Sequence, residues 1–189
     1  NKRDAAAETT DSPPITPKNV VSTNELMLPS GLDFSNYNWA LAGSPHGLDD
    51  YEVGEKIDHV DGMTVEEAEH QLATRLYQNT AKVHFDALAQ KGSRFGKRLI
   101  YGGVVISLAR ALSFNGLGNA FQIAAINGGR HIAPLFAGDT VYAWSEVLEV
   151  AALPDRADIG ALRTRMIATK NLTTASAPFK TGDAYTDGV

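Results

Sequence analysis

The apolar stretch over residues 104–114 is the sequence feature that most constrains the fold. It follows Gly102-Gly103 and contains a single charged residue, Arg110, so it predicts a helix buried against other elements. The segments that come after it are rich in β-branched and aromatic residues and are separated by turn signals, which predicts strands over residues 121–126, 140–150 and 161–169. A long apolar helix followed by successive antiparallel strands predicts an α+β fold, with the sheet wrapped around the helix.

A second helix is expected upstream of this core. Thr64 and Glu67 have the spacing of a capping box, in which each side chain satisfies a helix-end N–H of the other residue. A turn at Asp61-Gly62 is expected just before it. Apolar residues at helical spacing continue the helix to about Gln78 and predict its buried face. This stripe consists of Val65, Ala68, Leu72 and Leu76.

The N-terminal part of the chain has a different composition. Residues 5–24 are rich in Ala, Thr, Ser, Pro and Asn, a mixture that buries too little apolar surface to fold alone. From Leu26 to Leu48, single apolar residues stand among turn formers, which is typical of a segment that lies extended against another surface. We therefore predict a linker or extended segment over residues 1–45 and a folded domain over residues 46–189.

Composition and charge narrow the classes of function. A formal net charge of −5 gives no support to nucleic acid or an anionic membrane as a partner. The chain has no cysteine, which excludes disulfides and thiolate chemistry, and no apolar run is long enough to span a bilayer. His46, His59 and His70 have no metal-ligand grouping, so no metal is expected. A cytoplasmic location is the expectation.

The residues suited to chemistry fall in two neighbouring segments. His84 can move protons and has the side-chain amide of Asn79 a short way upstream. Gly103 lies where the central helix begins, and backbone N–H groups at a helix start can stabilise an enolate-like oxygen. Each residue also has a structural interpretation: His84 as a core histidine bonded to backbone, Asn79 as a helix cap, and Gly102 with Gly103 as small residues at a junction.

These segments resemble the MaoC-like hydratases of the hotdog fold, also called (R)-specific enoyl-CoA hydratases or hydratase 2. The resemblance rests first on Asn79-x-x-x-x-His84, on Tyr101-Gly102-Gly103 before the apolar helix, and on the run 136–140 that leads a strand. Three longer runs, 51–64, 73–81 and 124–131, look like the branch of mesaconyl-CoA hydratases, or β-methylmalyl-CoA dehydratases, which carry two hotdog halves in one polypeptide. The resemblance covers roughly residues 51–171.

The resemblance implies a lyase that reversibly hydrates a branched dicarboxylic enoyl-CoA, with no cofactor, because coenzyme A is part of the substrate. It implies His84, Asn79 and Gly103 as catalytic residues. The expected substrate-binding residues are Tyr101, Gly102, Arg98, Arg130 and His131. It also implies a second hotdog half as partner, since the chain resembles only the linker and second half of the double protein and ends where a last strand would be expected.

One departure from the family and two rival functions bear on this interpretation. Many of these hydratases carry Asp where this chain has Asn79, so His84 would be the one titratable member of the pair. A non-catalytic acyl-CoA-binding half is the main alternative. A hotdog thioesterase is less favoured, because such enzymes usually need a carboxylate on the central helix and residues 104–114 contain none. The basic run 91–98 is interpreted either as a solvated loop or as a clamp for coenzyme A phosphates.

Overall fold

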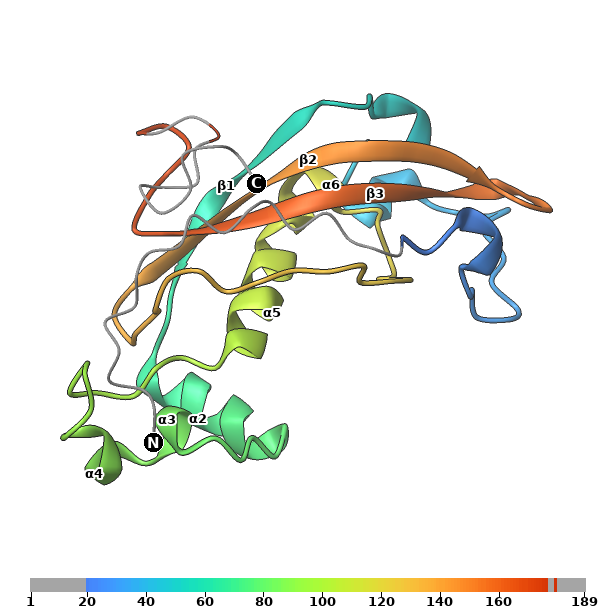
Figure 1. Cartoon of the computed structure of the whole chain (residues 1–189). Coiled ribbons are helices and arrows are strands. Elements are labelled where there is room, and N and C mark those ends of the chain that lie inside the picture. The colour runs from blue at the N-terminus through green and yellow to red at the C-terminus, as the bar shows by residue number, and fades with distance from the viewer. Residues whose placement is uncertain (1–19, 177–178, 180–189) are drawn as a thin grey trace.

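A three-stranded antiparallel sheet packed on one long helix forms the body of the protein in the computed structural model, which describes residues 20–176 and 179. The strand order is β1 (Lys56–Thr64), β2 (Thr140–Leu153) and β3 (Arg156–Lys170). Helix α5 (Gly102–Leu112) lies against one face of the sheet, as Figure 1 shows. The predicted α+β class and the predicted central helix are confirmed, and α5 begins two residues earlier than expected.

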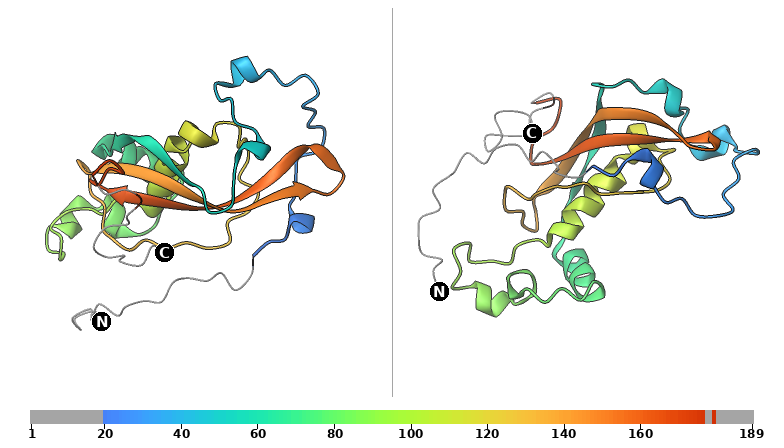
Figure 2. Two further views of the ribbon diagram at one scale, coloured as in Figure 1. Left: turned by 90° about the horizontal axis from the view of Figure 1, so that it is seen from above. Right: turned by 45° about the vertical axis from the view of Figure 1, so that its right-hand side comes forward.

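Apart from α6, which follows α5 and packs on β1, the remaining helices lie toward the two ends of the sheet. Figure 2 shows α2, α3 and α4 at one end, and the segment that carries η1 and α1 beside the hairpin of β2 and β3 at the other. Their bounds are η1 Thr23–Glu25, α1 Trp39–Ala42, η2 Leu48–Asp50, α2 Glu67–Leu76, α3 Lys82–Phe85, α4 Ala87–Gln90 and α6 Phe114–Leu117. Within the described residues, no helix combines the length and the apolar character needed to cross a bilayer.

The core lies between α5 and β2. Val104, Ala109 and Leu112 of the helix are buried, and they share one hydrophobic cluster with Val141 and Ala143 of β2. Residues two apart on a strand point to the same face, which is why alternate β2 residues reach the helix. Fully burying an aliphatic side chain stabilises the fold by about 1.5–3 kcal/mol, so this contact fixes where α5 lies on the sheet.

The N-terminal edge of the sheet was not anticipated. Residues 56–64 form β1, and the turn predicted at Asp61-Gly62 is wrong, because both residues lie within this strand. The pairing of β1 with β2 shifts between Asp58 and Gly62, and the exposed Val60 there has a positive φ of 60°. Gly62 is needed because a Cβ would lie 2.5 Å from the Tyr142 ring. This bulge and the polar residues around it hide the alternation by which a strand is recognised.

Helix α2 exists as predicted, but its cap and its buried face were predicted wrongly. The Thr64 hydroxyl lies 2.8 Å from that of Thr140, and the helix begins later, with the Glu69 carboxylate accepting the Glu66 N–H. Of the predicted stripe, Val65 is fully buried in the core but precedes the helix. Leu72 and Leu76 are 59% and 69% exposed. The buried residues of the helix are His70 and Thr74. His70 Nε2 accepts the Tyr101 N–H at 2.9 Å, and the Thr74 hydroxyl donates to the His70 carbonyl at 2.8 Å, so a polar face is buried here.

The predicted strand over residues 121–126 is wrong. No strand occurs between β2 and α6 in the described chain, and Phe121, Ile123 and Ile126 are half-exposed or more. The segment passes beside the sheet and the central helix in Figure 1 without pairing as a strand. Its partners are in the N-terminal segment: the Val21 N–H donates to Asn127 Oδ1 at 3.0 Å and Gln122 Nε2 to the Met27 carbonyl at 3.2 Å. Strand-forming residues become a strand only when they pair with a neighbouring strand, and among the described residues this segment bonds to the N-terminal segment and does not pair with the outer strand β3.

The N-terminal segment that the structure describes lies against this part of the molecule, as expected for an extended piece of chain. The Tyr37 hydroxyl donates to Asn119 Oδ1 at 2.6 Å, and Asn119 Nδ2 donates to the Ser44 and His46 carbonyls. Residues 1–19, 177–178 and 180–189 lie outside the described residues, so the start of the predicted linker and the C-terminal end of the predicted domain are not described. The boundary between a linker and a domain at residues 45 and 46 stays a prediction.

Gly116 gives a direct test of the junction between α6 and β1. Its φ is +103° and a Cβ would lie 2.5 Å from Ile57 Cγ2, so Gly116→Ala should lower the free energy of unfolding by more than about 1 kcal/mol. Gly92→Ala is the matched control, because nothing lies within 4 Å of its Cβ position and it should change stability by less than about 0.5 kcal/mol. Urea denaturation of both variants measures the difference. Equal stability of the two would contradict the assigned packing.

Candidate active site

His84 lies on the short helix α3, half-buried, with its ring directed toward the segment that leads into α5. Its Nδ1 is 3.0 Å from the Leu99 carbonyl oxygen. A carbonyl only accepts, so the neutral ring carries its proton on Nδ1 and keeps a lone pair on Nε2. The Tyr101 ring lies beside it, at 5.7 Å between centroids. The bond to backbone expected for a structural histidine is therefore present at Nδ1. It leaves the other ring nitrogen, Nε2, available as a base.

The N-terminus of α5 lies next to this imidazole. The Tyr101 N–H donates to His70 Nε2 at 2.9 Å, and the Val104 N–H donates to the Tyr101 carbonyl at 2.9 Å. The N–H groups of the first helical residues have no acceptor within the helix. Gly102 and Gly103 thus present backbone donors at the positive end of the helix dipole, in the geometry that suits an anionic oxygen.

Both glycines also allow other groups to approach the helix start closely. A Cβ on Gly103 would lie 2.7 Å from the Tyr101 ring, and a Cβ on Gly102 would lie 2.4 Å from His131 Nε2. The predicted residues Tyr101, Gly102, Gly103 and His131 are therefore brought together by the fold. Arg130, next to His131, lines the large groove of about 1960 Å³ between α5, the segment 119–135 and β3.

Asn79 has local backbone partners. Its Oδ1 accepts the Ala81 N–H at 2.9 Å and its own N–H donates to the Thr74 carbonyl at 2.9 Å. The left-handed residue at the end of α2 is Gln78, with φ 51°, so the predicted C-cap conformation belongs to its neighbour. Asn79 lines an open groove of about 490 Å³ that Gln71 and Phe85 also line.

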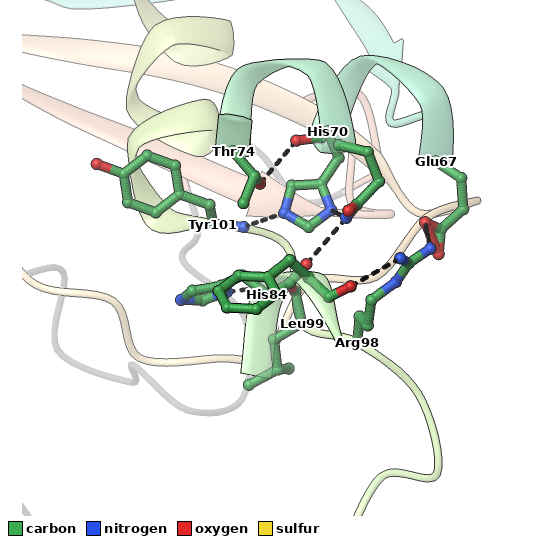
Figure 3. Close-up of polar contacts among 9 residues, drawn as sticks. Glu67, His70, Thr74, His84, Arg98, Leu99 and Tyr101 are labelled. Carbon is green, nitrogen blue, oxygen red and sulfur yellow. Dashed lines mark hydrogen bonds and ion pairs between the residues drawn. The ribbon is translucent and has the colours of Figure 1, made fainter. Parts of the chain in front are cut away.

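Arg98 is engaged within the protein. Its guanidinium is 2.5 Å from the Glu67 carboxylate and also donates to the Phe85 carbonyl at 3.2 Å. Figure 3 shows this arginine joining α2 to the end of α3. These contacts give Arg98 a structural function that needs no substrate. Its predicted role in substrate binding stays a prediction.

His70 is a residue of the site that the sequence did not single out for it. Its side chain is fully buried and its ring centroid lies 6.4 Å from that of His84. Figure 3 shows the two imidazoles near the start of α5. A backbone N–H can only donate, so His70 Nε2 is unprotonated and the proton is on Nδ1. Burial lowers the pKa of His70, which keeps the ring neutral. The signal in the sequence was one histidine on a predicted helix, between Glu69 and Gln71, which is not specific.

His59 is a second buried imidazole, at the other end of α5. Its Nδ1 donates to the Asn115 carbonyl at 2.7 Å, and its Nε2 accepts from the Ser145 hydroxyl at 2.8 Å. Burial lowers its pKa as well. The ring joins β1, α6 and β2 and has no contact with the candidate site, so its function is structural. No group of metal-ligating side chains occurs among the residues that the structure describes.

Comparisons with known proteins were made by sequence and by structure. No family model matches the chain. It is 58% identical over 167 residues to the β-methylmalyl-CoA dehydratase of Chloroflexus aurantiacus, covering 88% of this chain and 47% of that protein. It is 60% identical over 161 residues to the mesaconyl-CoA hydratase of Cereibacter sphaeroides, covering 85% of this chain and 45% of that protein. The chain spans about half the length of the curated relatives it matches.

A solved structure is similar to this chain in its fold as well as its sequence. The crystal structure described as a MaoC domain protein dehydratase from Chloroflexus aurantiacus matches 98% of this chain and 52% of its own length, with 55% identity and a TM-score of 0.82. The chain belongs to the MaoC-like hotdog proteins. A Mycobacterium tuberculosis protein with a double hotdog fold matches 80% of this MaoC-like chain and 44% of its own length, with 26% identity and a TM-score of 0.53. The predicted family and fold are confirmed.

The two buried imidazoles of this MaoC-like chain predict how its stability depends on pH. His59 and His70 have pKa values lowered by burial, whereas an unfolded histidine titrates near 6.5. Their contribution to stability is therefore complete above about pH 6.5 and is lost as the pH falls from there toward the lower folded pKa values. The urea midpoint should fall between about pH 7.5 and pH 5.5, and it should fall less in His59→Gln. A midpoint that is constant or rises on acidification would contradict the neutral assignments.

Proposed function

We propose that this chain is the catalytic hotdog half of a hydro-lyase that interconverts β-methylmalyl-CoA with mesaconyl-CoA and water. The observation that carries the proposal is a half-buried imidazole, His84, which is bonded through Nδ1 to the Leu99 carbonyl and whose ring lies 5.7 Å from that of Tyr101, the residue that caps the start of α5. A base beside a preorganised anion site is what chemistry next to a thioester carbonyl requires. The names of the two relatives, at 58% and 60% identity, support the same reaction.

In the dehydration direction, His84 Nε2 removes the proton from the carbon next to the thioester. The electron pair of that C–H bond moves toward the carbonyl, and negative charge builds on the thioester oxygen. The Gly103 N–H and the dipole of α5 stabilise this charge; a donor of this kind lowers a barrier by roughly 3–4 kcal/mol. The double bond then forms as the C–O bond at the next carbon breaks, and the leaving hydroxyl takes the proton of the His84 imidazolium, either directly or through a water held by Asn79 that gives one proton and receives another.

The second carboxylate of the substrate needs a cation, because a buried anion must be paired. Arg130 is the proposed partner, with His131 assisting, since His131 lies against Gly102 at the helix start and Arg130 lines the adjoining groove. A guanidinium binds a carboxylate through two parallel hydrogen bonds. Arg98 is a weaker candidate because Glu67 already neutralises it.

A second hotdog half, in the same polypeptide or another copy, is the proposed partner. Large apolar side chains are exposed in two regions of the surface, which is typical of surfaces that another protein covers. They include Leu72, Leu76, Tyr77 and Leu88 on the helical end and Phe121, Ile123 and Ile126 in the unpaired segment. The acyl-CoA is the substrate, no separate cofactor takes part, and the reaction is placed in the cytoplasm.

The assignment of the base is tested by two substitutions in the full-length protein. With mesaconyl-CoA as substrate and loss of the enoyl absorbance as readout, His84→Ala should lower kcat by about 10²–10⁴-fold, the usual contribution of a positioned acid or base. Asn79→Ala should lower it much less, because its amide orients groups and transfers no proton. Melting curves show whether each variant is folded.

The same assay separates this proposal from its alternative. Wild-type protein that binds acyl-CoA but hydrates no enoyl-CoA would make the chain an acyl-CoA-binding half without catalysis. Equal and small losses in the two variants would show that His84 is not the base.

The carboxylate partner is tested by Arg130→Leu. Loss of one charge-assisted hydrogen bond should raise the KM for mesaconyl-CoA by the equivalent of about 1.5–3 kcal/mol, while crotonyl-CoA, which has no second carboxylate, keeps its KM. Arg163→Leu is the matched control, since Arg163 lines the same groove and pairs with Glu149 at 2.8 Å. If both substrates weaken equally in Arg130→Leu, the carboxylate is bound elsewhere.

A further inference from the structure

One face of α2 is bonded to each segment of the candidate site. Residues at i, i+3, i+4 and i+7 lie on the same side of a helix, and here the residues at these positions are all polar. Glu67 pairs with Arg98, His70 accepts from the Tyr101 N–H, Gln71 donates to the His84 carbonyl at 2.9 Å, and the Thr74 carbonyl accepts the Asn79 N–H. The base side and the anion side of the site are thus held by a single helix, as the dashed lines in Figure 3 trace for Glu67, His70 and His84.

His70 has the most demanding position on this face. It is fully buried, and its Nε2 is the acceptor for the N–H of the residue that caps α5. The Thr74 hydroxyl donates to the His70 carbonyl at 2.8 Å, which anchors the next turn of α2 to the same residue. An apolar side chain could fill the same space but would leave the Tyr101 N–H without an acceptor in the interior. The fold therefore uses the imidazole as a hydrogen-bond acceptor.

We propose that His70 is a positioning residue for the hydration reaction: its unprotonated Nε2 holds Tyr101 so that the Gly102 and Gly103 N–H groups stay aligned with His84. The inference rests on the proposed function and deepens it. His70 touches neither substrate nor the reacting atoms. It acts through the backbone of Tyr101, which caps the start of α5 and whose ring lies 5.7 Å from that of His84.

Two substitutions at this position separate positioning from packing. Glutamine can place its side-chain oxygen where the imidazole Nε2 lies and can still accept from Tyr101, whereas leucine fills the space without an acceptor. In the full-length protein, His70→Leu should lower kcat by about 10²-fold, the effect of a small misplacement of reacting groups, with little change in KM. His70→Gln should recover most of this loss. Hydrogen exchange at the Tyr101 amide should be faster in His70→Leu than in His70→Gln.

Equal activity of His70→Leu and wild type would overturn the proposal, and so would equal losses in the two variants with unchanged exchange at Tyr101. If His70→Leu fails to fold, nitrogen NMR of the histidine rings in wild-type protein still decides. The proposal requires the His70 Nε2 signal of an unprotonated nitrogen and a proton on Nδ1, and a protonated Nε2 would refute it. These two readouts do not depend on turnover, so a wild type without hydratase activity would overturn the proposed function and leave the assigned geometry testable.

Discussion

The packing of α5 against β2 is the contact on which the other features of the chain depend. Val104, Ala109 and Leu112 bury one side of the helix against Val141 and Ala143, and this fixes the direction of the helix across the sheet. Because the helix is held along its length, its N-terminus cannot move independently of the sheet. A preorganised anion site needs donors that do not rearrange when charge develops, and a helix start anchored in this way meets that need.

The proposed base, His84, lies on a segment that has little packing of its own against this core. Helix α3 is four residues long and only half-buried at His84. Its position therefore depends on two hydrogen bonds of His84: Nδ1 donates to the Leu99 carbonyl, and the His84 carbonyl accepts from the Gln71 amide. Helix α2 supplies the Gln71 bond from a polar face, while its apolar residues Leu72 and Leu76 are exposed. The placement of polar groups inside and apolar groups outside is understandable if a second hotdog half covers the outer side.

The parts of the fold that the sequence predicted are those with strong periodic signals. Helix α5 and strands β2 and β3 have long apolar or alternating patterns, and each appears within a few residues of its predicted range. Strand β1 was missed because a bulge around Val60 interrupts its alternation. The segment 121–126 has the residues of a strand but bonds to the N-terminal segment instead of pairing with the sheet, and composition does not show which partner a segment will take.

The site was predictable where residues act through type and spacing, and not where they act through partners. His84 and the glycines that begin α5 could be proposed from the sequence because a histidine and a glycine-led helix start have recognisable chemistry. His70 was not, because a histidine becomes an acceptor for Tyr101 only once the fold brings residues 31 apart in sequence together. Arg98 was expected to bind substrate for the converse reason, since its pairing with Glu67 is invisible in the sequence.

The most direct test of the account is a structure of the full-length protein with mesaconyl-CoA bound to an inactive His84→Ala variant. The account predicts that the thioester oxygen lies within about 3.2 Å of the Gly103 nitrogen, the range of an N–H···O hydrogen bond. It also predicts that the carbon next to the thioester faces the position vacated by the imidazole. A thioester bound away from the start of α5, or an acyl chain with its reacting carbons turned away from residue 84, would contradict it.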